Sequence, residues 1–253
     1  MLLLFLLAYS FSSTAQNKEY TQICNEFQFT KTINNKWAAE IWLGNTFSNT
    51  PTENNILKTS IQRYFFAWAD YHYSSRWKLS GSLAHFDNKD VPDIGQYYSP
   101  EWRLTLQGVY YIHKLGYTLS TRMRGELRHI MDADGVYQNK YRYRQQIKYQ
   151  QPIGSKVLRK GIFYGFGSDE IFLKENANTA GITFFDRNRV ELGGGYQLTD
   201  DAQIELFYSN EFLPREKGNK IYNAINLTVS FNNLWRNIKK KKETKRAAAQ
   251  TPD

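Results

Sequence analysis

Residues 117–130 alternate between charged or small polar side chains and mostly apolar ones. One parity carries Thr118, Ser120, Arg122, Arg124, Glu126 and Arg128, and the other carries Tyr117, Leu119, Thr121, Met123, Gly125, Leu127 and His129. Successive side chains of a strand point to opposite faces, so the pattern predicts a strand with one ionic and one largely apolar face. In a soluble sheet the apolar face is buried inside, whereas in an outer-membrane barrel it faces lipid.

The same alternation recurs along the chain in segments separated by turn-rich gaps. We predict ten strands, near 36–47, 57–71, 75–86, 100–113, 116–130, 140–150, 159–173, 184–198, 202–213 and 219–231. Residues 26–33 also alternate, and with residues 17–24 they leave the predicted count at ten to twelve. Globular strands usually hold about 5–6 residues and tilted membrane strands need about 9–11, so the long segments favour membrane strands.

The gaps between the predicted strands alternate in length. Short gaps lie at 73–74, 114–115, 152–156 and 199–200, and longer gaps lie at 48–56, 87–99, 131–139, 174–183 and 214–218. Bacterial barrels place short turns on the periplasmic side and longer loops outside. The sequence therefore predicts an all-β fold, an antiparallel transmembrane β-barrel of ten to twelve strands with short periplasmic turns and longer outer loops.

The N-terminus predicts export. An apolar run over residues 1–8 is too short to span a bilayer, and small residues at Ser13 and Ala15 fit a signal-peptidase site before Gln16. After Ala15 no run of about 18 apolar residues occurs, so entry into a membrane requires a barrel. We expect the protein to be located in the cell outer membrane. The chain divides into four predicted segments: a signal peptide (1–15), an N-terminal segment that has room for an extra strand (16–35), the β-barrel (36–231) and a basic tail (232–253).

The last predicted strand ends on an aromatic residue, Phe231, with a run of apolar residues on the same face. This ending resembles the terminal signal that barrel-assembly machinery reads, although 22 residues follow it (253 minus 231). Outer-membrane lipid and, during insertion, that machinery are the expected partners. The tail is basic, but on an exported chain we expect no nucleic-acid partner.

Five short motifs carry a family resemblance. They are Glu126-Leu127-Arg128, Arg142-Tyr143-Arg144-Gln145-Gln146, Asp169-Glu170-Ile171-Phe172, Asn188-Arg189 and Gly193-Gly194-Gly195-Tyr196-Gln197-Leu198. With them, the chain from Glu26 to Phe231 resembles the outer-membrane barrel family known only as domain of unknown function 2490. The resemblance implies a barrel in a Gram-negative outer membrane and brings no established activity or catalytic residues.

Parity places many charged side chains in the predicted lumen. Arginines and carboxylates on neighbouring strands should pair there, since an unpaired buried charge costs several kcal/mol. The fold then contains either a structural ionic network that fills the barrel or a small pore that favours anions, because cations outnumber carboxylates. The predicted lumen network is Arg103, Arg122, Arg124, Glu126, Arg128, Arg142, Arg144, Arg187, Arg189, Glu191 and Glu205.

Two alternatives to a structural or passive-transport protein stay open. His72 and Ser74 are spaced as in outer-membrane lipases and lipid A deacylases, where a base must reach the nucleophile's proton. The predicted topology puts them at a periplasmic turn and no third member is evident, so we expect no enzyme, with a lipid hydrolase as the alternative. The second alternative is a soluble periplasmic barrel that binds an apolar ligand.

Metal and cofactor signals are weak. Asp132 and Asp134 could present two carboxylates to calcium on an outer loop, but the following Gly135 is more typical of a turn. Nothing matches a nucleotide loop, a zinc site or a Rossmann turn. We therefore expect no cofactor and no metal.

Overall fold

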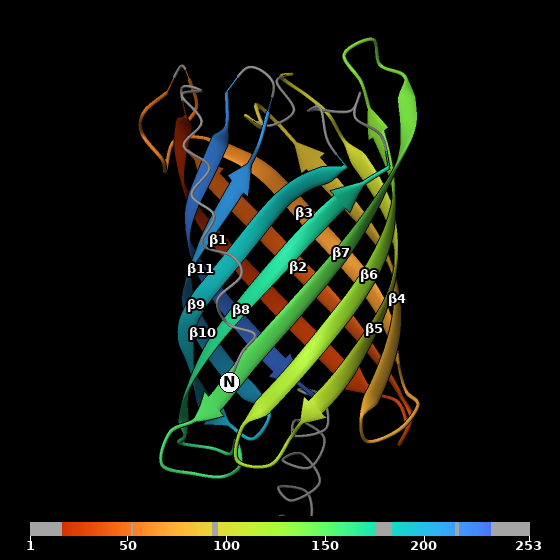
Figure 1. Cartoon of the computed structure of the whole chain (residues 1–253), viewed down its shortest axis with the longest axis vertical. Coiled ribbons are helices and arrows are strands. Elements are labelled where there is room, and N and C mark those ends of the chain that lie inside the picture. Colours follow the sequence, from red (N-terminus) through yellow and green to blue (C-terminus); the bar gives the residue numbers. More distant parts are fainter. Residues whose placement is uncertain (1–16, 52, 93–95, 176–183, 216–217, 234–253) are drawn as a thin grey trace, which may run out of the picture.

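The computed structural model of the chain describes residues 17–51, 53–92, 96–175, 184–215 and 218–233. Within them the chain forms one closed barrel (Figure 1). The predicted signal peptide and nearly all of the basic tail lie outside the described residues. The strands are β1 (Lys18–Thr32), β2 (Trp37–Ser48), β3 (Ser60–His72), β4 (Trp77–Asn88), β5 (Glu101–His113), β6 (Thr118–Met131), β7 (Tyr137–Pro152), β8 (Phe163–Lys174), β9 (Phe185–Thr199), β10 (Ala202–Leu213) and β11 (Lys220–Asn232).

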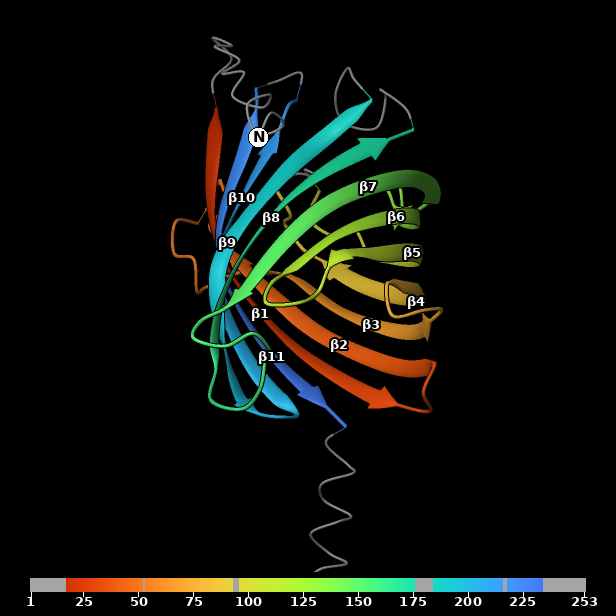
Figure 2. The same ribbon diagram turned by 60° about the horizontal axis from the view of Figure 1, so that its bottom comes forward.

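The barrel closes through a parallel seam between β1 and β11, which lie side by side in Figure 2. The register runs without a break from Lys18 opposite Lys220 to Thr30 opposite Asn232. All other neighbouring strands pair antiparallel. The prediction of a wholly antiparallel barrel is therefore wrong at this seam, because an odd number of strands brings the first and last strands together in the same direction.

The eleven strands fall within the predicted range of ten to twelve. The segments 17–24 and 26–33 form one continuous strand, β1, so the barrel begins at Lys18 and not at residue 36. Connections lie at two ends, which we call the turn end (bottom of Figure 1) and the loop end (top). Two predicted connection lengths are wrong: the connection at the turn end between β7 and β8 covers residues 153–162, and the loop between β6 and β7 covers only 132–136.

The two faces of the barrel wall differ as the alternation predicted. Outward side chains are mainly apolar and exposed, with Leu106 at 67% and Leu192 at 69%. Inward side chains are mainly polar or aromatic and buried, with Thr105 at 0% and Glu126 at 3%. The interior therefore holds the polar and aromatic faces of the strands, and the apolar faces surround the barrel. In the described residues, no helix is long and apolar enough to cross a membrane.

Aromatic rings encircle the turn end on the outer surface. They form pairs across neighbouring strands, with ring centroids 4.4 to 5.4 Å apart. This ring of aromatic pairs, which we call the aromatic girdle, comprises Phe29 with Phe231, Trp37 with Tyr71, Trp77 with Tyr110, Tyr117 with Tyr149, and Phe163 with Tyr196. Outer-membrane barrels carry such girdles of aromatic residues at the interface between lipid and water.

Candidate functional site

The carboxylate of Glu126, in the middle of β6, lies at the centre of the charged lumen. Arg142 Nη2 lies 2.6 Å from its Oε2, and Arg144 Nη1 lies 2.9 Å from its Oε1. Arg103 Nη1 and Arg124 Nη1 are each 3.9 Å from Oε1. The Glu126 side chain has no exposed surface, so these charges are taken out of water and must neutralise one another.

A second carboxylate, Glu170 on β8, extends this arrangement. Arg144 donates from Nε to one oxygen at 2.9 Å and from Nη2 to the other at 2.7 Å. This is the bidentate geometry that suits a guanidinium and a carboxylate. Arg122 Nη2 contacts the same carboxylate at 2.7 Å. Arg144 therefore bridges Glu126 and Glu170, and joins three neighbouring strands.

The pairing continues toward the loop end. Glu101 accepts from Arg103 Nε at 2.6 Å and from Arg128 Nη2 at 2.7 Å. Glu211 on β10 accepts from Arg189 Nε at 2.6 Å, and Arg187 Nη1 lies 3.0 Å from it. We call the whole set the arginine network: Arg103, Arg122, Arg124, Arg128, Arg142, Arg144, Arg187 and Arg189 with Glu101, Glu126, Glu170, Asp186, Glu191 and Glu211.

The structure brings most of the predicted lumen residues together and sets one apart. Glu191 joins the edge of the network, 3.9 Å from Arg189 Nη1. Glu205 instead accepts a hydrogen bond from Tyr164 Oη at 2.7 Å, and no described arginine lies within ion-pair distance of it. Glu205 therefore faces the lumen as predicted, but its partner is a tyrosine and not an arginine.

The predicted lumen network omits several charged residues that the structure places in the lumen, among them Glu170, Asp186 and Arg215. Glu170 has the inward parity of its strand and could have been found by that signal. Asp186 lies at a register shift between β8 and β9, which turns its 6%-exposed side chain inward beside Arg187. Arg215 follows β10 and pairs with Asp186 at 3.1 Å, but a residue outside the strands follows no alternation.

Aromatic rings fill the space beside the guanidinium groups. Arg103 Cζ lies 3.9 Å from the centroid of Phe86, and Arg124 Cζ lies 5.2 Å from that of Trp68. Cations within about 6 Å of a ring face are attracted to it. On the opposite side of the network, Phe172 is approached by four arginines, with Arg144 at 4.3 Å. The interior is thus packed with rings and ion pairs.

A smaller polar cluster lies inside the turn end. Lys78 Nζ is 3.3 Å from Asp70 Oδ2 and 3.7 Å from Glu40 Oε1. Ser80 donates its hydroxyl hydrogen to Asp70, and Trp42 donates from Nε1 to Glu40 at 2.9 Å. Each member of this cluster has a partner within it, so it can hold β2, β3 and β4 together.

His72 and Ser74 lie at the turn between β3 and β4. The Ser74 hydroxyl oxygen accepts from the backbone N–H groups of Arg76 at 3.2 Å and Trp77 at 3.1 Å. Within the described residues no hydrogen bond joins His72 to Ser74. Ser74 thus stabilises the turn, a role that serine hydroxyls commonly have.

Asp132 and Asp134 lie in the short loop after β6. Asp132 Oδ1 accepts from the backbone N–H groups of Val136 at 2.9 Å and Asp134 at 3.0 Å, and Oδ2 accepts from Gln138 at 2.7 Å. The hydrogen bond from Val136, followed by the others, lowers the pKa of Asp132 below its usual value. No group of three or more potential metal ligands occurs in the part of the chain described above.

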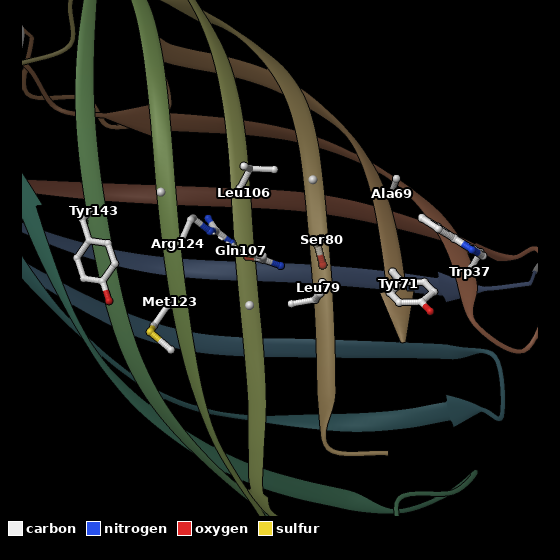
Figure 3. Close-up of a pocket in the computed structure, with 13 residues that line it drawn as sticks. Trp37, Ala69, Tyr71, Leu79, Ser80, Leu106, Gln107, Met123, Arg124 and Tyr143 are labelled. Carbon is white, nitrogen blue, oxygen red and sulfur yellow. Dashed lines mark hydrogen bonds between the residues drawn. The ribbon is translucent and has the colours of Figure 1, made fainter. Parts of the chain in front are cut away.

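The outer wall carries a hollow of about 640 Å³. Its floor includes Gly81, Gly108 and Gly125, where the wall has no side chains to present. Figure 3 shows Leu79, Leu106, Met123 and Tyr143 at this hollow, and the side chains of Arg124 and Gln107 close together. Apolar side chains line most of this hollow, in keeping with the rest of the outer face.

Comparison with known proteins gives a family match and a distant structural similarity. The profile of the family described as "Protein of unknown function (DUF2490)" matches residues 11–222. Among solved structures, "LpxR from Salmonella typhimurium" is 9% identical, with a TM-score of 0.41 over 78% of this chain and 83% of that chain. No curated protein matches the sequence.

Proposed function

The chain belongs to the DUF2490 family, whose function is unknown, and on that premise we propose that it is an integral outer-membrane barrel whose lumen is closed by its own side chains. Its role in this proposal is structural, and it does not provide an open pore. The observation that carries the proposal is the packing around Glu126, whose side chain has no exposed surface.

The outer surface supports a place in a membrane. Strands of 12 to 16 residues are long enough to cross a hydrocarbon layer at a tilt, which takes about 9–11 residues. Their outward faces are apolar, and the aromatic girdle lies where an interface between lipid and water is expected. Outer-membrane lipid and the barrel-assembly machinery are the partners that this proposal implies.

The interior supports a closed lumen. Seven of the eight network arginines contact a carboxylate directly, and rings pack on several of them. The carboxylates of these pairs are only 0–15% exposed, so opening a path would require breaking ion pairs where little water is present to replace the lost partner. A permanently water-filled channel would leave these side chains exposed.

Conductance in planar bilayers tests the proposal. We expect the purified protein to insert without adding ion conductance. The Glu126→Gln variant, which leaves Arg142 and Arg144 with one fewer anionic partner, is expected to leak. Steady single-channel currents from the unaltered protein would overturn the closed-lumen proposal. Release of the native protein from membranes by carbonate alone would overturn its membrane placement.

A passive anion pathway is the second candidate function. The observation in its favour is the charge balance of the arginine network, which comprises eight arginines and six carboxylates. If currents appear, this candidate predicts that chloride carries more of them than potassium. Currents selective for potassium would exclude it.

The proposal gives no catalytic role to His72 and Ser74. The Ser74 hydroxyl already accepts two backbone hydrogen bonds, which orient it along the turn. We expect cells that carry His72→Ala in place of the unaltered protein to keep the same lipid composition. A change in acyl-chain content of the outer-membrane lipids would favour the hydrolase.

A further inference from the structure

Three buried polar atoms without partners lie in one row across β3, β4 and β5. Trp68 stands opposite Ser82 in the register, and Ser82 stands opposite Thr105. Trp68 Nε1, Ser82 Oγ and Thr105 Oγ1 have no hydrogen-bond partner among the described residues. The side chains are 4%, 5% and 0% exposed. We call these residues the Trp68 row.

Such a row needs a physical explanation. Buried polar groups are nearly always hydrogen-bonded, and an unpaired one costs free energy. Directly opposed residues on neighbouring strands lie only about 5 Å apart, so Ser82 has Trp68 on one side and Thr105 on the other along the inner wall. A single small bound species that accepts hydrogen bonds could satisfy all three at once.

The charge at this place is positive. Arg124 Cζ lies 5.2 Å from the centre of the Trp68 ring, so the guanidinium reaches from β6 to the row. Arg124 donates from Nε and Nη2 to the neutral amide oxygen of Gln107 at 3.0 and 2.7 Å. Alone among the eight network arginines, it has no carboxylate oxygen within 3.5 Å in the described part of the chain.

The nearby carboxylate does not cancel this charge. Glu126 stands opposite Thr105, but its oxygens are held at 2.6 and 2.9 Å by Arg142 and Arg144. Arg103 and Arg124 approach it only to 3.9 Å. Arg103 and Arg144 also pair with Glu101 and Glu170, so Arg124 is the one guanidinium group around Glu126 that has no carboxylate at hydrogen-bond distance among the described residues.

We propose that the Trp68 row and Arg124 form a binding site for a small monovalent anion of the halide class. An indole N–H and a guanidinium can only donate hydrogen bonds, and the two hydroxyls can donate as well, so the four groups suit an acceptor-only ligand. The anion also compensates the charge of Arg124. The inward face of β4 presents only small side chains next to the row, Ser80, Ser82 and Ala84.

Bromide is the probe for this site. The full-length protein, folded in detergent micelles, is heated in sodium bromide and in sodium gluconate at equal ionic strength. A ligand that binds only the folded state raises Tm in a saturable manner. We expect such a rise for the unaltered protein with bromide, and an apparent affinity at least about tenfold weaker in Ser82→Ala/Thr105→Val, since two donors are lost.

Two further variants keep the test decisive. Trp68→Phe removes the indole N–H and keeps an aromatic ring against Phe66, so it should weaken the bromide response and leave the fold intact. Thr228→Val removes a buried hydroxyl on β11, away from the row, and should leave the response unchanged. An equal response in all variants would overturn the site.

Crystals soaked in bromide locate the ion. Anomalous scattering at the Trp68 row supports the proposal, whereas a water molecule there without anomalous signal overturns it. The outcome is separate from that of the proposed function: a closed barrel without bromide binding leaves the structural role standing, and a conducting barrel overturns that role whatever bromide does.

Discussion

Tyr64 and Glu26 are joined by a hydrogen bond that passes over a whole strand. Tyr64 Oη on β3 lies 2.6 Å from Glu26 Oε2 on β1, and Gly44 of β2 lies between them in the register. The same arrangement recurs on the other side of β11, where Thr228 stands opposite both Glu26 and Glu205. There Tyr164 on β8 donates to Glu205 on β10 at 2.7 Å, across Gly195 of β9.

Each arrangement fixes three strands with one side chain. A ring can lie flat over the middle strand only if that strand carries no side chain at this position, and a Cβ at Gly44 would overlap the Tyr64 ring. The ring then covers the backbone, and its hydroxyl reaches the carboxylate on the next strand. Both arrangements stiffen the barrel wall outside the arginine network.

The first prediction concerns Gly44→Ala. The added methyl group displaces the Tyr64 ring and breaks its hydrogen bond to Glu26, and such overpacking costs about 1–3 kcal/mol. We expect a lower urea midpoint for unfolding in lipid vesicles, followed by tryptophan fluorescence. Gly125→Ala is the matched control, since a Cβ there meets no atom within 4 Å. Equal midpoints for the two variants would contradict the arrangement.

The second prediction concerns Glu126→Gln. Arg142 and Arg144 both pair with the Glu126 carboxylate, and the substitution removes this shared partner. Breaking a buried ion pair lowers the free energy of unfolding by about 3–5 kcal/mol. Urea unfolding should show this loss. Glu53→Gln removes an exposed loop ion pair with Lys58, and exposed pairs contribute only about 0–1 kcal/mol. Comparable losses in both variants would mean that the lumen pairs are solvated.

The alternation of the sequence predicts which face of a strand looks inward, and this sufficed for most of the arginine network. It fails where the period is broken. Asp186 has outward parity beside Arg187 and Arg189, and only the register shift opposite Phe172 and Leu173 turns it inward. Arg215 lies between strands, where no period exists.

The alternation of the sequence also does not predict the register between neighbouring strands. Trp68, Ser82 and Thr105 are far apart in sequence, and they form a row only because two hairpins align them. The parallel seam has the same origin. Patterning shows that β1 and β11 are both strands. Closure of a barrel with an odd number of strands decides that these two strands pair in parallel.

The third prediction concerns the two ends of the barrel. With an odd number of strands, Lys18 begins at the loop end and Asn232 finishes at the turn end. With loops facing outside, an epitope tag placed directly before Asn17 should be bound by antibody on intact cells. A tag placed directly after Asn233 should be bound only after permeabilisation.

A tag after Leu57, in an exposed part of the loop between β2 and β3, marks the outer side in the same experiment. The loop between β2 and β3 and the start of β1 at Lys18 lie at the same end of the barrel. The tag before Asn17 must therefore be on the same side of the membrane as the tag after Leu57. Finding both end tags on the same side would show an even number of strands.

The fourth prediction uses the single cysteine to test the seam. Cys24 on β1 stands opposite Asn226 on β11, and both side chains face the lumen. Neighbouring strands lie about 4.8 Å apart, within the Cα separation of about 4.4–6.8 Å that a disulfide spans. Under mild oxidation, Asn226→Cys should therefore give an internal disulfide, seen as faster migration of the denatured, unreduced chain.

Thr228→Cys is displaced by two residues and faces Glu26, so it should cross-link far less. Cross-linking of Thr228→Cys in preference to Asn226→Cys would shift the register, and cross-linking of neither would mean that β1 and β11 do not meet.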